Sequence, residues 1–178
     1  MGQLTNLQAI RLYKSIERNI GKAAADDFAE KLPLSKSATF ERKFKWAKDV
    51  CEYLESTYSR DDIKKIRMDC ACGPSKQQMD DLKALFLSSN SLKEFAEKSS
   101  CEYYSIWCED DTLFLSYPRC YCSCVKRSSE TLSETWCMCT LGYTKRFFDY
   151  ALNCDTRIEL IESVKTGSSR CVIKITKG

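Results

Sequence analysis

The chain has 178 residues, the size of one ordinary domain, and a single core of this size can bury enough apolar surface to fold unaided. Its 28 lysine and arginine residues against 25 aspartate and glutamate residues leave a net charge of +3, which predicts no sequence-independent binding of nucleic acid. Histidine is absent, so a Cys-His dyad, a Ser-His-Asp triad and every imidazole ligand are excluded. We expect one domain over residues 1–178.

The N-terminal residues do not have the pattern of a secretion signal. Residues 1–20 mix apolar side chains with Arg11, Lys14, Glu17 and Arg18 instead of forming an apolar run. No stretch of the chain is long and apolar enough to span a bilayer. These features predict a cytoplasmic protein without a membrane segment.

Residues 1–100 are predicted to be helical, because apolar side chains recur there with the spacing of one helix face. The two clearest rows are Leu4, Leu7, Ile10, Leu12 and Ile16, and then Phe40, Phe44, Ala47, Cys51, Leu54 and Tyr58. Gly21, Leu32–Pro33 and Gly73–Pro74 interrupt the pattern, and Ser75 is placed to begin a further helix. We expect this half to be mostly scaffold.

Residues 101–178 have a different texture, with short β-type runs and many cysteines. Residues 103–108 and 112–117 predict a hairpin around the acidic turn 109–111, and residues 157–164 and 170–176 predict a second hairpin. Between them lie a cysteine run at 120–124, a polar loop at 126–133 and a helix at 141–153. The predicted fold is therefore α+β, with a helical N-terminal half packed on an antiparallel sheet in the C-terminal half.

The twelve cysteines are the unusual feature of the composition. In a reducing compartment an excess of thiols more often binds metal or takes part in catalysis than forms disulfides, although isolated cysteines are usually small buried hydrophobes. We predict that the isolated residues Cys51, Cys101, Cys108 and Cys154 are small buried hydrophobic side chains. The C-x-C pairs are Cys70 with Cys72, Cys122 with Cys124, and Cys137 with Cys139.

The geometry of a C-x-C pair limits what it can bind. On a regular strand such a pair supplies one ligand to a shared ion, so both thiols bind the same ion only where the backbone is bent. Cys70 and Cys72 are a second possible thiol pair near a helix N-terminus, where thiolates are favoured.

The last hairpin places a carboxylate in an apolar row. Glu162 shares a strand face with Ile158, Leu160 and Val164, and a loop over residues 165–168 would place it directly opposite Cys171. Because an unpaired buried carboxylate is costly, a shared metal ion would account for this pair. Two alternatives stay open: the hairpin is slipped by one residue or exposed at an edge, so that Glu162 is solvated, or Arg170 forms a salt bridge with it.

A resemblance to a known family points to the same residues. The segments 136–143 (WCMCTLGY) and 159–167 (ELIESVKTG), followed by Cys171, resemble the C-terminal part of 4-vinyl reductase-like ligand-binding domains. Those include aromatic-sensing input domains of bacterial activators and relatives of aminothiazoline-carboxylate hydrolases. The resemblance implies a zinc ion held by Cys139, Glu162 and Cys171.

One ligand position of that pattern holds Lys165 in this chain. Cys122, Cys124 or Cys137 could substitute for the missing ligand. The predicted metal site therefore comprises Cys122, Cys124, Cys137, Cys139, Glu162 and Cys171, with zinc as the cofactor.

These observations lead to one main functional hypothesis and two alternatives. The first is a stand-alone, sensor-like bacterial protein with a structural zinc ion, which binds an apolar or aromatic small molecule and forms a homodimer as related domains do. The second is a thiol- or zinc-dependent hydrolase of a small amidine or amide, so whether the chain is an enzyme stays open. The third is a redox or metal-handling protein that uses the C-x-C pairs.

Overall fold

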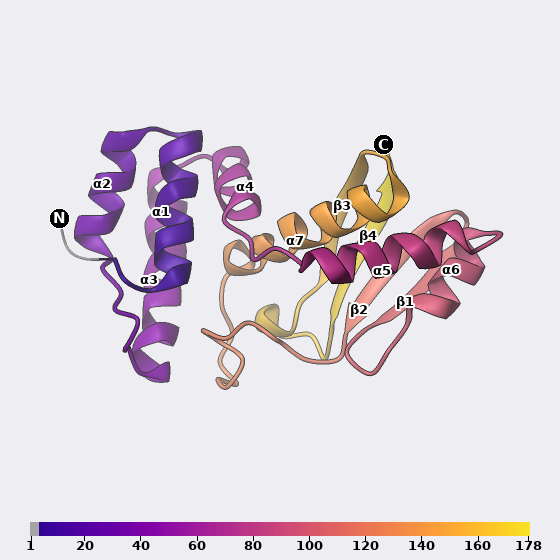
Figure 1. Cartoon of the computed structure of the whole chain (residues 1–178). Coiled ribbons are helices and arrows are strands. Elements are labelled where there is room, and N and C mark those ends of the chain that lie inside the picture. The colour runs from indigo at the N-terminus through magenta and orange to yellow at the C-terminus, as the bar shows by residue number, and fades with distance from the viewer. Residues whose placement is uncertain (1–3) are drawn as a thin grey trace. The chain divides into compact units, whose positions relative to one another are not determined.

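The computed structural model describes residues 4–178, which form seven α-helices, one short 3₁₀ helix and four strands (Figure 1). In chain order these are α1 (Leu7–Asn19), α2 (Lys22–Lys31), α3 (Phe40–Thr57), α4 (Arg60–Asp69), α5 (Lys76–Leu87), α6 (Leu92–Ser99), β1 (Ser105–Glu109), β2 (Thr112–Tyr117), α7 (Glu134–Leu152), β3 (Thr156–Glu162), η1 (Val164–Thr166) and β4 (Cys171–Lys177). The predicted α+β class is confirmed.

The chain forms two compact units, and each unit takes two separate segments of the sequence. Unit 1 comprises Met1–Ala71 and Tyr121–Cys139, and unit 2 comprises Cys72–Cys120 and Thr140–Gly178. Helix α7 begins in the first unit and ends in the second. In the described part of the chain, residues 4–178, no helix combines the length and the apolar character that crossing a bilayer requires.

Unit 1 is built from α1 to α4, and its helices begin where the sequence supplies a cap. The side chains of Asn6, Thr39 and Ser59 each accept a hydrogen bond from a backbone N–H in the first turn of α1, α3 and α4, respectively. Gly21 precedes α2 at a φ of 133°, a conformation that favours glycine. The fully buried side chains include Leu12, Ile16, Phe28, Trp46, Leu54 and Ile66.

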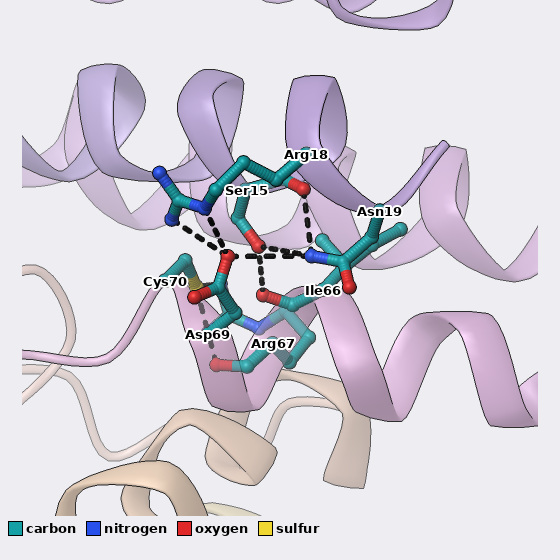
Figure 2. A network of polar contacts seen from close by, with 7 residues as sticks. All are labelled: Ser15, Arg18, Asn19, Ile66, Arg67, Asp69 and Cys70. Atoms are coloured by element: carbon teal, nitrogen blue, oxygen red, sulfur yellow. Dashed lines mark hydrogen bonds and ion pairs between the residues drawn. The ribbon is translucent and has the colours of Figure 1, made fainter. Parts of the chain in front are cut away.

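Polar contacts fix α4 against α1 (Figure 2). The hydroxyl of Ser15 is buried and donates to the carbonyl oxygen of Ile66 at 2.7 Å. At the exposed rim the Arg18 guanidinium contacts the Asp69 carboxylate at 2.6 Å, and Asn19 donates to the same carboxylate at 3.3 Å. These contacts hold the C-terminal end of α4, which is where Arg67 and Cys70 lie.

The second segment of unit 1 differs from its predicted form at one point. Residues 121–133 form a loop that includes the polar loop predicted at 126–133, with a tight turn in which Lys126 N–H donates to the Cys122 carbonyl oxygen at 2.9 Å. The following helix begins at Glu134 rather than at Leu141, so Cys137 and Cys139 lie on α7 and not on a strand. Residues two apart on a helix are separated by about 200° around its axis, so these two thiols leave opposite sides of α7.

Unit 2 contains an antiparallel sheet with the strand order β1-β2-β4-β3 and the helices α5 and α6. Ser75 begins α5 with a capping box that it forms with Gln78, which confirms the predicted helix start. The β1–β2 hairpin turns through Asp110 and Asp111, both at positive φ. The predicted hairpins are thus both present.

The register of the second hairpin corrects the predicted metal pair. The predicted pairing is right up to Leu160, which lies opposite Ile173, but a β-bulge at Ile161 then places Glu162 opposite Val172 and not opposite Cys171. Glu162 instead contacts the Arg170 guanidinium at 3.7 Å, and both side chains are substantially exposed. Of the open alternatives, the salt bridge to Arg170 is confirmed, and the register is slipped by one residue only beyond the bulge.

Candidate functional site: an arginine among cysteines

Arg67 is a buried cation in the core of unit 1. It lies on the inner face of α4 with Ile63 and Ile66, and only 4% of its surface is exposed. Burying an ionised group costs several kcal/mol unless hydrogen bonds or an opposite charge compensate it. The neighbours of this guanidinium therefore decide what the site can do.

The guanidinium donates hydrogen bonds to two backbone carbonyl groups of α7. Nε of Arg67 donates to the Thr135 carbonyl oxygen at 3.1 Å, and Nη2 donates to the Trp136 carbonyl oxygen at 2.6 Å. The guanidinium carbon also lies 4.6 Å from the centroid of the Trp136 ring, which is cation–π geometry. Arg67 thus ties the end of α4 to the first turn of α7, both within unit 1.

The electrostatic partners of Arg67 are thiols. Among residues 4–178 no aspartate or glutamate forms an ion pair with it, whereas its Nη1 donates to Cys70 Sγ at 3.4 Å. Burial acts to lower the pKa of Arg67, but the nearby Cys70, Cys139, Cys51 and Cys122 outweigh it, and the pKa is raised above its ordinary value. We call Arg67 with Cys51, Cys70, Cys122, Cys137 and Cys139 the Arg67–cysteine cluster.

Two thiols of this cluster, Cys51 and Cys139, have raised pKa values. Burial raises the pKa of Cys51 to about 12, and it raises the pKa of Cys139 well above its usual range although Arg67 opposes that shift. Cys70, Cys122 and Cys137 all act on Cys139, and Cys137 also acts on Cys51. Four separate segments of unit 1 therefore bring their cysteines to one guanidinium.

Each segment positions its thiol for a local reason. Cys51 lies on the buried face of α3 with Ala47 and Leu54, as its predicted role as a small buried side chain requires. Cys70 is the C-terminal cap of α4, where its N–H donates to the Ile66 carbonyl oxygen at 3.0 Å. The helix N-terminus predicted near the Cys70 and Cys72 pair is that of α5, which begins at Lys76, whereas Cys70 itself lies at the C-terminus of α4.

Gln8 of α1 connects the loop cysteines to this region. Its Nε2 lies 3.8 Å from Cys122 Sγ, and its Oε1 accepts from the thiol of Cys124. Cys124 is 2% exposed, so its side chain is part of the core of unit 1. The two thiols of this C-x-C pair thus share one glutamine side chain.

Trp136 adds an unsatisfied donor to the site. It is 3% exposed, and its ring packs edge-on against Trp46 with the centroids 5.9 Å apart. Within the described residues its indole Nε1 has no hydrogen-bond partner, whereas Nε1 of Trp46 donates to the Leu32 carbonyl oxygen at 2.9 Å. Two of the three tryptophans of the chain therefore lie at the Arg67–cysteine cluster.

The structure divides the six predicted metal ligands between the units. Cys122, Cys124, Cys137 and Cys139 lie in unit 1, and Glu162 and Cys171 lie in unit 2. Cys171 Sγ accepts the Val164 N–H at 3.4 Å, and Lys165, which occupies the position of the missing ligand, is a buried residue of η1.

The zinc prediction is wrong. In the described range 4–178 no three cysteine, aspartate or glutamate side chains are placed to hold a metal ion. The physical reason in unit 2 is the β-bulge at Ile161, which moves Glu162 away from Cys171. In unit 1, the side chains of Cys137 and Cys139 leave opposite sides of α7, so they do not point toward one ion. That these two cysteines belong to a functional site stays a prediction.

Sequence reasoning missed Arg67, although a signal for it exists. Ile63, Ile66, Arg67 and Cys70 have the i, i+3, i+4, i+7 spacing of a buried helix face. A basic residue inside such a row has to be paired in the core. Cys70 belongs to the same row, so its position on the face that carries Arg67 could also be read from the sequence.

A hollow of about 340 Å³ lies in unit 2, at the end of the sheet where β1 begins and β2 ends. Its lining includes Cys101, Tyr104, Ser105, Ser116, Ser169 and Arg170. Burial, with Cys101 nearby, raises the pKa of Tyr104 to about 12, so its phenol is a neutral hydrogen-bonding group. The binding of an apolar or aromatic small molecule stays a prediction.

Three comparisons relate this chain to known proteins. The model of a family of unknown function, DUF6144, matches residues 1–178. No curated protein matches the sequence. Solved structures of H-NOX proteins from Shewanella oneidensis match nearly the whole chain.

The crystal structure of a mutant H-NOX protein in the Fe(II) ligation state has a TM-score of 0.50 and 15% identity, and the match covers 98% of this chain and 96% of that chain. An NMR structure of an H-NOX domain in the Fe(II)CO state has a TM-score of 0.49 and 13% identity, with 98% of each chain covered. The crystal structure shows that the fold is H-NOX-like. The resemblance to 4-vinyl reductase-like domains, which rested on the sequence segments 136–143 and 159–167 and on Cys171, is therefore wrong.

Proposed function

The chain belongs to the family of unknown function DUF6144, and we propose that it is a sensor-like protein that detects a small thiol-reactive molecule at the Arg67–cysteine cluster. One observation carries the proposal: a buried guanidinium contacts the sulfur of Cys70, lies near enough to three further cysteines for them to act on its pKa, and forms no ion pair with a carboxylate among residues 4–178. A site of this kind is prepared for negative charge on sulfur.

The fold supports the sensor-like part of the proposal. The H-NOX protein with the comparable fold carries Fe(II) in its crystal structure. Side chains that hold iron in haem proteins are histidine, cysteine, methionine and tyrosine, and this chain has no histidine. The thiol of Cys139 is neutral because of its burial, so it does not fit the role of a thiolate ligand either.

No histidine is present to hold iron and Cys139 does not suit the role of a thiolate ligand, so no step of the proposal passes through iron. The cysteine sulfur is the group that can react with a small molecule. Cys51 is 3% exposed and Cys70 is 9% exposed, so access is restricted to molecules of a few atoms. When a small reagent reacts with one of these thiols, Arg67 is in place to stabilise the negative charge that develops.

Tryptophan fluorescence tests the proposal, because two of the three tryptophans lie at the cluster. In Trp107→Phe protein the emission reports on Trp46 and Trp136 alone. Hydrogen peroxide, a nitric oxide donor and sodium sulfide would each be titrated against this protein. We expect at least one of them to change the emission, because Trp136 stacks on the guanidinium that the thiols surround.

Arg67→Met in the same background should abolish the response, and Arg67→Lys should keep part of it because the charge is retained. Circular dichroism would establish that each variant is folded. Cys154→Ser, which changes a thiol of unit 2, is the control and should respond like the parent protein. If none of the three reagents changes the emission, the proposed function is wrong.

The comparisons give no support to the alternative of a hydrolase of an amidine or amide, and we do not propose it. The redox alternative is the one that the geometry favours, since it needs only the thiols and the guanidinium.

A further inference from the structure

We infer that Cys70 is a site of reversible oxidation by hydrogen peroxide, and that Cys139 resolves the oxidised form into a Cys70–Cys139 disulfide. The inference rests on the proposed function and names the reactive residues of the same site.

Cys70 is the thiol that the guanidinium contacts directly. Its sulfur accepts from Arg67 Nη1 at 3.4 Å, and its S–H donates to the Arg67 carbonyl oxygen at 3.3 Å (Figure 2). Ionisation of the thiol gives up the second contact and strengthens the first into a charge-assisted hydrogen bond. The thiolate is the nucleophile in thiol chemistry, so the geometry favours attack by Cys70.

The position of Cys70 in the fold also limits which reagents can reach it. The residue follows the last turn of α4, and the chain continues from it into the segment 71–75, which is neither helix nor strand. The residue as a whole is 9% exposed, which favours a molecule the size of peroxide over a bulky aromatic disulfide. Size selection of this kind is what a sensor of a small oxidant requires.

Cys139 is the partner that helix geometry selects. It lies three residues after Trp136 and four after Thr135, the two residues whose carbonyl groups Arg67 holds, so it lies on the same face of α7. Its thiol is close enough to Arg67 and to Cys70 for both to act on its pKa. Cys137 leaves the opposite side of the helix, and it acts on Cys51 as well as on Cys139.

The chemistry balances in two steps. The Cys70 thiolate attacks one oxygen of peroxide, an S–O bond forms, the O–O bond breaks, and the departing hydroxide takes a proton to become water. The Cys139 sulfur then attacks the Cys70 sulfur, an S–S bond forms, the S–O bond breaks, and the departing hydroxide takes the proton of the Cys139 thiol and leaves as a second water. Peroxide accepts the two electrons that the two thiols lose. The product would link the end of α4 covalently to α7.

Mass spectrometry of the full chain tests the inference. After peroxide treatment we expect the wild-type protein to lose the mass of two hydrogen atoms, to give a linked peptide containing Cys70 and Cys139, and to recover with dithiothreitol. Cys139→Ser protein should instead carry a dimedone adduct at Cys70, because the sulfenic acid has lost its resolving thiol. Cys70→Ser should show neither product, and Cys154→Ser should behave like wild type.

Arg67→Met should slow the oxidation of Cys70 by about tenfold or more, since each pKa unit changes the thiolate fraction about tenfold. A disulfide between other cysteines, or an unchanged oxidation rate in Cys70→Ser, would overturn the inference. A fluorescence response with oxidation elsewhere would overturn it and leave the proposed function standing. The absence of any fluorescence response would instead overturn the proposed function itself, so the two failures are distinguishable.

Discussion

Cysteines occur in both units, but their surroundings differ. In unit 1 the cysteines of α3, α4, the loop and α7 lie around one buried guanidinium. In unit 2, Cys171 accepts a backbone N–H, and the nearby Arg170 and Glu162 pair at the surface. The role of a thiol in this protein therefore depends on the charge beside it and not on its C-x-C spacing.

The largest effect should come from the aromatic part of the cluster. Trp136→Ala removes a buried indole from between Arg67 and Trp46, so we expect a loss of about 3–5 kcal/mol in the free energy of unfolding. Trp107→Ala in unit 2 removes a partly exposed ring that stacks on Phe114 at 5.2 Å, and it should cost clearly less. Urea unfolding measures the free energy of unfolding of both variants. Equal losses would contradict the claim that the two units differ in this respect.

Arg67→Met should have the next largest effect on stability. The variant loses two hydrogen bonds to backbone carbonyl groups and one to Cys70, but it also removes a buried charge, so we expect a net loss of about 1–3 kcal/mol. Arg18→Met is a matched control on the exposed rim of the α1–α4 contact, and it should cost at most about 1 kcal/mol. A rim variant that destabilises more than Arg67→Met would show that the buried guanidinium is not structurally important.

Stability should fall at alkaline pH because of the buried thiols. An unfolded cysteine ionises near pH 8.5, whereas burial raises the pKa of Cys51 in the folded chain to about 12. The unfolded state therefore releases protons first, and stability falls by about 1 kcal/mol per pH unit for each such thiol as pH rises above 8.5.

Cys51→Ala should flatten this slope in urea unfolding measured between pH 8 and 10. Cys108→Ala is the control in unit 2, because Cys108 is only partly buried and its raised pKa reflects weaker desolvation. A slope that Cys51→Ala leaves unchanged would argue against a neutral, buried thiol at that position.

The smallest effect is expected at the residue that the sequence had marked as a metal ligand. Glu162→Gln breaks a 3.7 Å contact between two substantially exposed side chains, so the change in unfolding free energy should stay within about 0.5 kcal/mol. Chelator treatment should not change that result. A loss of several kcal/mol would mean that Glu162 has a partner of higher charge than Arg170.

Periodicity and caps were sufficient to predict the helical half, both hairpins and the helix that begins after Ser75. They could not predict the β-bulge at Ile161, because one extra residue leaves the alternation of the sequence intact while it shifts the pairing. The early start of α7 was missed because Trp136 and its cysteine neighbours also suit a strand.

The candidate site was predictable only in part. Its cysteines were marked by their density, but Cys51 was taken as isolated, and Arg67 was not considered at all. The cluster joins residues 51, 67–70, 122 and 137–139, and only the packing of α3, α4 and α7 in unit 1 brings them together. No local pattern contains that information.

The most direct test of the central claim is the fluorescence of Trp107→Phe protein during peroxide treatment, compared with the same protein carrying Arg67→Met. Our account predicts that peroxide changes the emission of Trp46 and Trp136 in the first protein, that dithiothreitol reverses the change, and that Arg67→Met abolishes it while the chain stays folded. An equal and reversible change in both proteins would contradict the account, because the thiols would then respond without the buried guanidinium.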